Sequence, residues 1–349
     1  MGCFIQENKR TVMENNNFSA GAATIDIHHI GAGFYTRRGI TLEPPARPQQ
    51  LRCLVLSRDD RLTVIFNADW GSWFKFVEET RQIVEEVEPG RIIEVLCFAT
   101  QADHNIDAFD VFFGSLSPKD KRHDPQSRAD LQQAIRQVFE QALQSMRSAQ
   151  IAVGQGECRS VAANSYFGKG HADPTVSVLR IADLDGQLIA AGVNFACRSY
   201  DIDIPHLSGG FSGATEAMVQ KIYGSVPVLF FQAGGGDHFS ALVENPVNVA
   251  TEGVEKFREE HHRLLIREYD RLGRMLGGEV CKVLAELEVA GKRLQTQNER
   301  WRYTSWVQKT NGYLITQPMV TVYRVPLRLW HRPLPSVNEW GVTHYAVAL

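Results

Sequence analysis

Short apolar runs alternate with longer amphipathic stretches over most of the chain, and this alternation limits the folds open to it. The run at 226–234, VPVLFFQAG, is apolar from Val226 to Phe231, as in a strand that is covered on both faces. The stretch at 71–87 instead repeats its apolar residues at helical spacing. Strands that alternate with helices predict an α/β fold, with a mixed β-sheet sandwiched between helices.

The same reading predicts the other elements. A hairpin is expected from 51–57 and 61–69 around Arg-Asp-Asp, and a second one turns at Asp185-Gly186. Further strands are expected at 91–100, 175–183 and 188–197, and helices at 124–149, 212–224 and 252–288. Ser127 and Asp130 have capping-box spacing, and Gly277-Gly278 predicts a break in the last helix. We expect a disordered lead-in at 1–18 and one α/β domain at 19–349, β-rich from about 293.

Composition excludes several classes of protein. The 349 residues are 44% hydrophobic, which is enough for a large core, and the net charge of −3 favours neither nucleic acid nor acidic membranes as partners. No apolar stretch approaches the roughly 18–20 residues of a membrane span, and the start lacks a signal core. Six scattered cysteines without C-x-x-C spacing indicate reduced thiols. We therefore expect a cytoplasmic protein without a transmembrane segment, whose oligomeric state the sequence does not fix.

Polar clusters follow four of the predicted strands. In open α/β sheets, ligands bind beyond the carboxyl ends of the strands, so these clusters are the candidate site. The candidate residues are Asp69, Gln101, Asp103, His104, Arg198, His206, Gly235, Gly236, Asp237, His238 and Ser240.

Each cluster taken alone has a second interpretation. Asp69 is placed either to bind a ligand or to cap the next helix. Asp103 and His104 are neighbours, so in an extended segment they point to opposite faces. The glycines at 234–236 allow close approach of a ligand to the backbone, or only a tight turn. No G-K-[ST] follows them, so a phosphate loop is not expected.

The order of the motifs resembles the N-terminal catalytic region of the neutral ceramidase family, which are zinc-dependent amidohydrolases. The matching segments, from about Gly21 to Ser240, are AGAATIDI with GFYTRRG, LRCLVLSRDDRLTVIFNAD, DPTVSVLRIADLDGQLIAAGVNFACR and VPVLFFQAGGGDHFS. The last of them resembles the segment that carries the serine used by that family. The resemblance implies an amide hydrolase of the same fold.

The chain departs from the family where the family's zinc ligands and serine lie. Gln101-Ala102-Asp103 stands in place of a His-x-His pair, and Arg198 in place of a histidine. A guanidinium cannot bind zinc, and its fixed charge repels the ion. Phe239 holds the serine position, with Ser240 next to it. No cofactor is therefore expected, unless zinc is retained through a register shift that brings in Asp103, His104 or His206.

Three functions fit these features. The first is a divergent ceramidase-like hydrolase of an amide or ester bond in a small or lipid-like substrate. Its catalytic residues would be Asp237, His238 and Ser240, and its substrate-binding residues Asp69, Gln101, Arg198, Gly235 and Gly236. The second is a catalytically altered relative that binds a small anion through Arg198 and the glycine loop without zinc, in a pocket walled by Trp70 and Trp73. The third is a structural or interaction protein.

Overall fold

The structure is a computed structural model of the chain. It describes residues 18–31, 48–70, 73, 76–100, 125–164, 172–197, 209–234, 238–241 and 254–288, and the backbone of five short strands at 294–295, 307–308, 312–315, 321–326 and 343–348.

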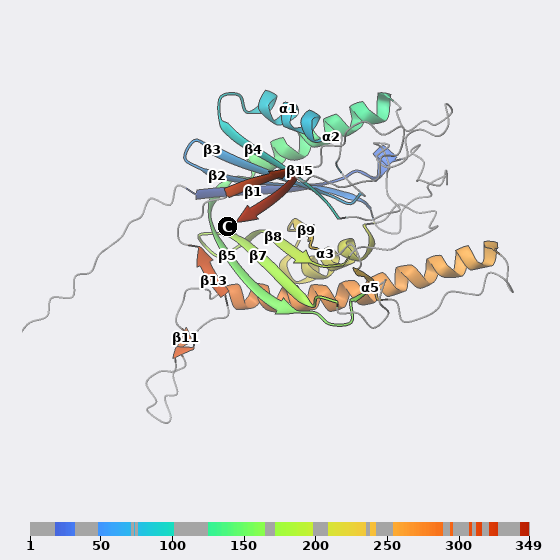
Figure 1. Cartoon of the computed structure of the whole chain (residues 1–349). Coiled ribbons are helices and arrows are strands. Elements are labelled where there is room, and N and C mark those ends of the chain that lie inside the picture. The colour runs from blue at the N-terminus through green and yellow to red at the C-terminus, as the bar shows by residue number, and fades with distance from the viewer. Residues whose placement is uncertain are drawn as a thin grey trace, which may run out of the picture.

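The first half of the fold is a four-stranded sheet with two helices on its outer face. Its strands lie in the order β4-β3-β2-β1, with β3 and β4 parallel and the other neighbours antiparallel. The helices α1 and α2 cover one face of this sheet (Figure 1). The elements are β1 (Phe18–Asp26), the short 3-10 helix η1 (His28–Gly31), β2 (Gln50–Arg58), β3 (Arg61–Ala68), α1 (Val77–Val87), β4 (Ile92–Ala99) and α2 (Pro125–Gln144).

The second half repeats this plan with another sheet and two more helices. The strand order is β5-β7-β8-β9, where β8 and β9 are parallel, and β13 pairs with β5. The helices α3 and α5 lie on the outer face (Figure 1). The elements are β5 (Arg147–Glu157), β6 (Ala162–Asn164), β7 (Thr175–Asp183), β8 (Leu188–Phe195), α3 (Gly210–Tyr223), β9 (Val228–Gln232), β10 (His238–Ser240), α5 (Val254–Leu287), β11 (Leu294–Gln295), β12 (Val307–Gln308), β13 (Gly312–Ile315), β14 (Thr321–Pro326) and β15 (Thr343–Ala348).

The two sheets face each other, so the chain forms four layers: helices, sheet, sheet and helices. They are joined at one side where β1 pairs with β5. Across the gap, the rings of Phe98 and Phe231 meet edge to face with centroids 4.9 Å apart. Three separate apolar clusters fill the spaces between successive layers. The predicted α/β fold with a mixed sheet between helices is confirmed, and the structure adds that the sheet folds back on itself.

Strand alternation sends every second side chain into the space between the sheets. On β2, Leu54 and Leu56 enter this space, whereas Cys53 and Val55 face the helices. The same alternation directs Arg52 on β2, Asn67 and Asp69 on and after β3, and Thr100 after β4 into the space between the sheets. We call these four buried residues the polar end of the intersheet layer, because the rest of that layer is apolar.

Most of the predicted elements are confirmed. The hairpin at 51–69 is β2 and β3, and the turn at Gly186 adopts φ 89° between β7 and β8. The first helix is shorter than expected, because α1 begins only at Val77. The capping-box prediction is wrong: α2 begins at Pro125, a residue favoured in the first helical turn, so Ser127 lies inside the helix.

The predicted break at Gly277-Gly278 is also wrong, since α5 is one helix of 34 residues. Gly273 and Gly277 lie against α3, where a Cβ on Gly273 would come within 2.3 Å of the Cβ of Ala214. These two glycines therefore let the two helices pack closely. None of the helices that the structure describes is both long and apolar enough to cross a membrane.

Candidate functional site

The carboxyl ends of β3, β4, β8 and β9 lie on one side of the molecule. Each of the two pairs is parallel, and contacts between β3 and β9 and between β4 and β9 align the pairs. The strands β4, β8 and β9 end at this edge, at Ala99, Phe195 and Gln232. Eight candidate residues lie outside the described residues: Gln101, Asp103, His104, Arg198, His206, Gly235, Gly236 and Asp237.

Asn67 fixes β9 against the other sheet. Its side-chain Nδ2 donates to the carbonyl of Phe230 at 2.7 Å, and its Oδ1 accepts from the amide of Phe230 at 3.2 Å. The side-chain amide of Asn67 thus makes the two hydrogen bonds that a neighbouring strand would make to the backbone of Phe230 on the edge strand β9. The bond pair aligns the carboxyl ends of β3 and β9.

Asp69 is completely buried and is held by Arg52. Arg52 Nη1 donates to Asp69 Oδ1 at 3.0 Å, Arg52 Nη2 donates to Oδ2 at 3.1 Å, and the amide of Gln50 donates to Oδ2 at 3.0 Å. Asp69 does not cap the next helix, since α1 begins after Phe76 without a side-chain cap. The structure therefore excludes the capping interpretation and places Asp69 at the strand-end edge.

Glu216 on α3 is a second carboxylate bound to Arg52. Arg52 Nε donates to both oxygens of Glu216 at 3.1 Å, and the amide of Val228 donates to Oε1 at 3.2 Å. Burial alone would lower the pKa of Arg52, but Asp69 and Glu216 raise it above its ordinary value. Two carboxylates thus share one guanidinium inside the protein.

Sequence reasoning missed Arg52 and Glu216. The available signal was a charged residue within the apolar run LRCLVL and another among the apolar residues of the helix at 212–224. Charged residues are rarely fully buried unless they are paired. The sequence does not show which partner each would find, because the pair joins residues 164 positions apart.

The structure places His238 and Ser240 on the same face of β10, and both are buried. The amide of Asp173 donates to His238 Nε2 at 3.1 Å, so the neutral ring carries its proton on Nδ1. Ser240 Oγ has no hydrogen-bond partner in the described part of the chain. His238 and Ser240 therefore point to the same side of β10, but no hydrogen bond joins their side chains. Their catalytic roles stay a prediction.

The helix α5 anchors the end of β10. Arg271 Nη2 donates to the carbonyl of Ala241, the residue after Ser240, at 2.9 Å. Glu268 is buried and accepts from Arg271 Nε at 3.0 Å, which orients the guanidinium. The strand that carries two candidate residues is thus tied to the outer helical layer.

Trp70 and Trp73 do not form the wall of an anion pocket, as the second hypothesis expected. Both are buried in the core between the first sheet and its helices, with their rings 4.5 Å apart between centroids. Trp73 Nε1 donates to the carbonyl of Phe98 at 2.6 Å. Their large apolar rings are used to fill the core.

The donors that the structure describes at this edge do not fit a zinc ion. Asp69 already accepts from Arg52 and Gln50. Burial, and then the neighbouring Cys158, raise the pKa of the Cys197 thiol above its ordinary value. Within the described residues, no three His, Cys, Asp or Glu side chains gather as a metal site.

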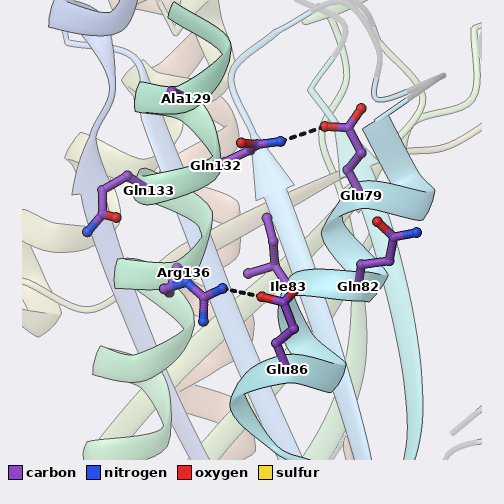
Figure 2. A pocket seen from close by; sticks show the side chains of 8 residues that line it. All are labelled: Glu79, Gln82, Ile83, Glu86, Ala129, Gln132, Gln133 and Arg136. Atoms are coloured by element: carbon purple, nitrogen blue, oxygen red, sulfur yellow. Dashed lines mark hydrogen bonds and ion pairs between the residues drawn. The ribbon is translucent and has the colours of Figure 1, made fainter. Parts of the chain in front are cut away.

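A groove of about 290 Å³ lies elsewhere, between α1 and α2 on the outer face of the first sheet (Figure 2). Its charges are paired: Arg136 contacts Glu86, and Gln132 Nε2 donates to Glu79 Oε2 at 2.9 Å. The first sheet separates this groove from the polar end of the intersheet layer. We do not include it in the candidate site.

Comparison with solved structures identifies the architecture. Neutral ceramidase from Pseudomonas aeruginosa superposes with a TM-score of 0.60 over 76% of this chain and 44% of that chain, at 17% identity. The chain has a ceramidase-like fold. A structure described as ceramidase complexed with C2 gives a TM-score of 0.57 over 75% of this chain and 44% of that one, also at 17% identity. The chain thus spans less than half the length of these ceramidase chains. No protein-family model and no curated protein matches it.

Proposed function

We propose that the chain is a ceramidase-like hydrolase that cleaves an amide or ester bond in a small or lipid-like substrate. The observation that carries this proposal is the ceramidase-like four-layer fold, in which four strand ends and the buried polar residues beside them share one edge. Ligand sites in α/β sheets lie at such an edge. The proposed substrate class is that of the ceramidases whose fold the chain shares.

Ser240 is the proposed nucleophile, because its buried hydroxyl makes no competing hydrogen bond in the described part of the chain. Its oxygen attacks the acyl carbon, and its proton passes to His238 and then to the departing amine or alcohol. Water then cleaves the acyl-serine. His238 can accept that proton only on a nitrogen without one, so the bond from the amide of Asp173 to Nε2 must open first.

The remaining candidate residues are proposed to bind the substrate: Asp69, Gln101, Arg198, Gly235 and Gly236. No step in this scheme requires zinc. The proposed serine chemistry therefore differs from the metal-dependent chemistry that the family resemblance implies.

A second candidate function is the binding of a small anion through Arg198 and the glycine loop without catalysis. The engaged Nε2 of His238 favours it, because a histidine held in that way is not ready to act as a base. Binding of a labelled carboxylate that is lost in Arg198→Ala, together with no hydrolysis, would favour this candidate over the first.

The proposal is tested with a fluorescent short-acyl ceramide and a p-nitrophenyl ester as substrates of the purified chain. Ser240→Ala is expected to lower kcat/KM by at least about 100-fold, as removal of a nucleophile does. Ser57→Ala is the matched control, since Ser57 is a buried strand serine at the far end of β2. Absence of hydrolysis by the wild type, or full activity of Ser240→Ala, would contradict the proposal.

A further inference from the structure

Buried polar atoms without partners gather around the Arg52–Asp69 pair. Thr100 Oγ1, Gln49 Oε1 and Thr24 Oγ1 have no hydrogen-bond partner among the described residues. Gln49 Nε2 donates to the carbonyl of Asp69 at 2.7 Å, and Thr24 is the register partner of Arg52. Buried polar atoms in native proteins nearly always have a partner. Such a group at a strand-end edge therefore indicates a place where a ligand supplies the missing bonds.

Thr100 is the best placed of the three. Its amide donates to the carbonyl of Ala68 at 3.0 Å, which extends the parallel register of β3 and β4 by one residue and sets Thr100 beside Asp69. Alternation from Leu96 directs the Thr100 side chain into the space between the sheets. Thr100 is only 1% exposed, so its hydroxyl cannot form a hydrogen bond with bulk water.

The charges around Thr100 define which ligand group fits. Both oxygens of Asp69 accept from Arg52, and Arg52 also binds Glu216, so these three side chains together carry a net charge of −1. The amino end of α3 is also near, since a Cβ on Gly209 would lie 3.0 Å from Asp69 Oδ2. Asp69 offsets the partial positive charge of that helix end. An anion would meet the net negative charge of these three side chains, whereas an uncharged oxygen can accept the hydroxyl proton of Thr100.

We propose that Thr100 is a ligand-binding residue whose hydroxyl bonds an uncharged carbonyl or hydroxyl oxygen of the bound molecule. The proposal rests on the proposed function only for the choice of probe. It differs from the anion-binding alternative, because it places a neutral group beside the carboxylate pair.

The test compares Thr100→Val with Thr100→Ser. Binding of the fluorescent short-acyl ceramide is followed by fluorescence polarisation, and stability by the melting temperature. Thr100→Val is expected to weaken binding about 5- to 10-fold, the effect of one lost hydrogen bond. The same variant should melt at the wild-type temperature or up to about 2 °C above it, because an unpaired buried hydroxyl is removed. Thr100→Ser should keep the wild-type affinity.

Thr215→Val is the control, because the buried Thr215 hydroxyl has a partner: it donates to the carbonyl of Phe211 at 2.9 Å. This variant should keep its affinity and not gain stability. A clear fall in the melting temperature of Thr100→Val would show a structural partner and overturn the proposal. Unchanged affinity in Thr100→Val would overturn it while leaving the hydrolase proposal in place. If the wild type neither binds nor cleaves the probe, both the hydrolase proposal and the role of Thr100 in binding are overturned.

Discussion

Replacing Arg52 with methionine is expected to lower the free energy of unfolding by about 3–5 kcal/mol, the usual cost of breaking a buried ion pair from one side. The substitution leaves Asp69 and Glu216 buried without their common cation. Their side chains are 1% and 6% exposed, so water cannot replace the guanidinium. Urea unfolding followed by circular dichroism gives the change directly.

Arg128→Met is the control for the loss of one arginine. Arg128 contacts Glu79 at the surface, and its side chain is 59% exposed. Exposed ion pairs contribute only about 0–1 kcal/mol. Arg52 joins the two halves of the fold, because Asp69 follows β3 and Glu216 lies on α3. An equal loss of unfolding free energy in Arg52→Met and Arg128→Met would contradict this role.

Gly273→Ala is expected to destabilise the protein by about 1–3 kcal/mol, the range for overpacked cores. The new Cβ would lie 2.3 Å from the Cβ of Ala214 and 2.6 Å from its backbone carbonyl carbon, so α3 and α5 must move apart. This cost exceeds the gain of at most about 1 kcal/mol from the better helix propensity of alanine. The measurement is again the free energy of unfolding in urea.

Gly278→Ala is a matched control on the same helix, because a Cβ there meets no atom within 4 Å. It should stabilise the protein by about 0.5–1 kcal/mol through helix propensity alone. If Gly273→Ala stabilised the protein as much as Gly278→Ala, the close packing of α3 on α5 would be refuted.

Most of the main elements could be predicted from the sequence, because their strands and helices carry their own apolar patterns, but β5, which joins the two sheets, was not among the predicted strands, and its first residues were expected in a helix. The hairpin of β2 and β3 shows this, since both strands are buried and the turn between them is polar. The glycines of α5 show the limit of this reading. A glycine pair is typical of a helix break, and only the position of Ala214 on another helix reveals that close packing requires Gly273.

The sequence predicts at which edge of the sheet the candidate site lies, but not which of its residues contact one another. The polar cluster after β3 led to Asp69, but its partner Arg52 lies on another strand and Glu216 on a distant helix. Thr100 carries no such signal, because a threonine at a strand end is ordinary in sequence. Its importance depends on an unpaired hydroxyl, which is a property of the packed structure. The folding of one sheet into two facing layers was likewise not visible in the pattern of any single strand.

The most direct test of the central claim, a ceramidase-like hydrolase with a zinc-independent site, is the zinc content of the purified chain measured together with its amide hydrolysis. The protein is prepared without chelator or immobilised nickel, and elemental analysis is repeated on His104→Ala. We expect hydrolysis of the fluorescent short-acyl ceramide by protein that holds far less than one zinc per chain. One zinc per chain, lost together with the activity in His104→Ala, would contradict the claim and restore the metal-dependent mechanism.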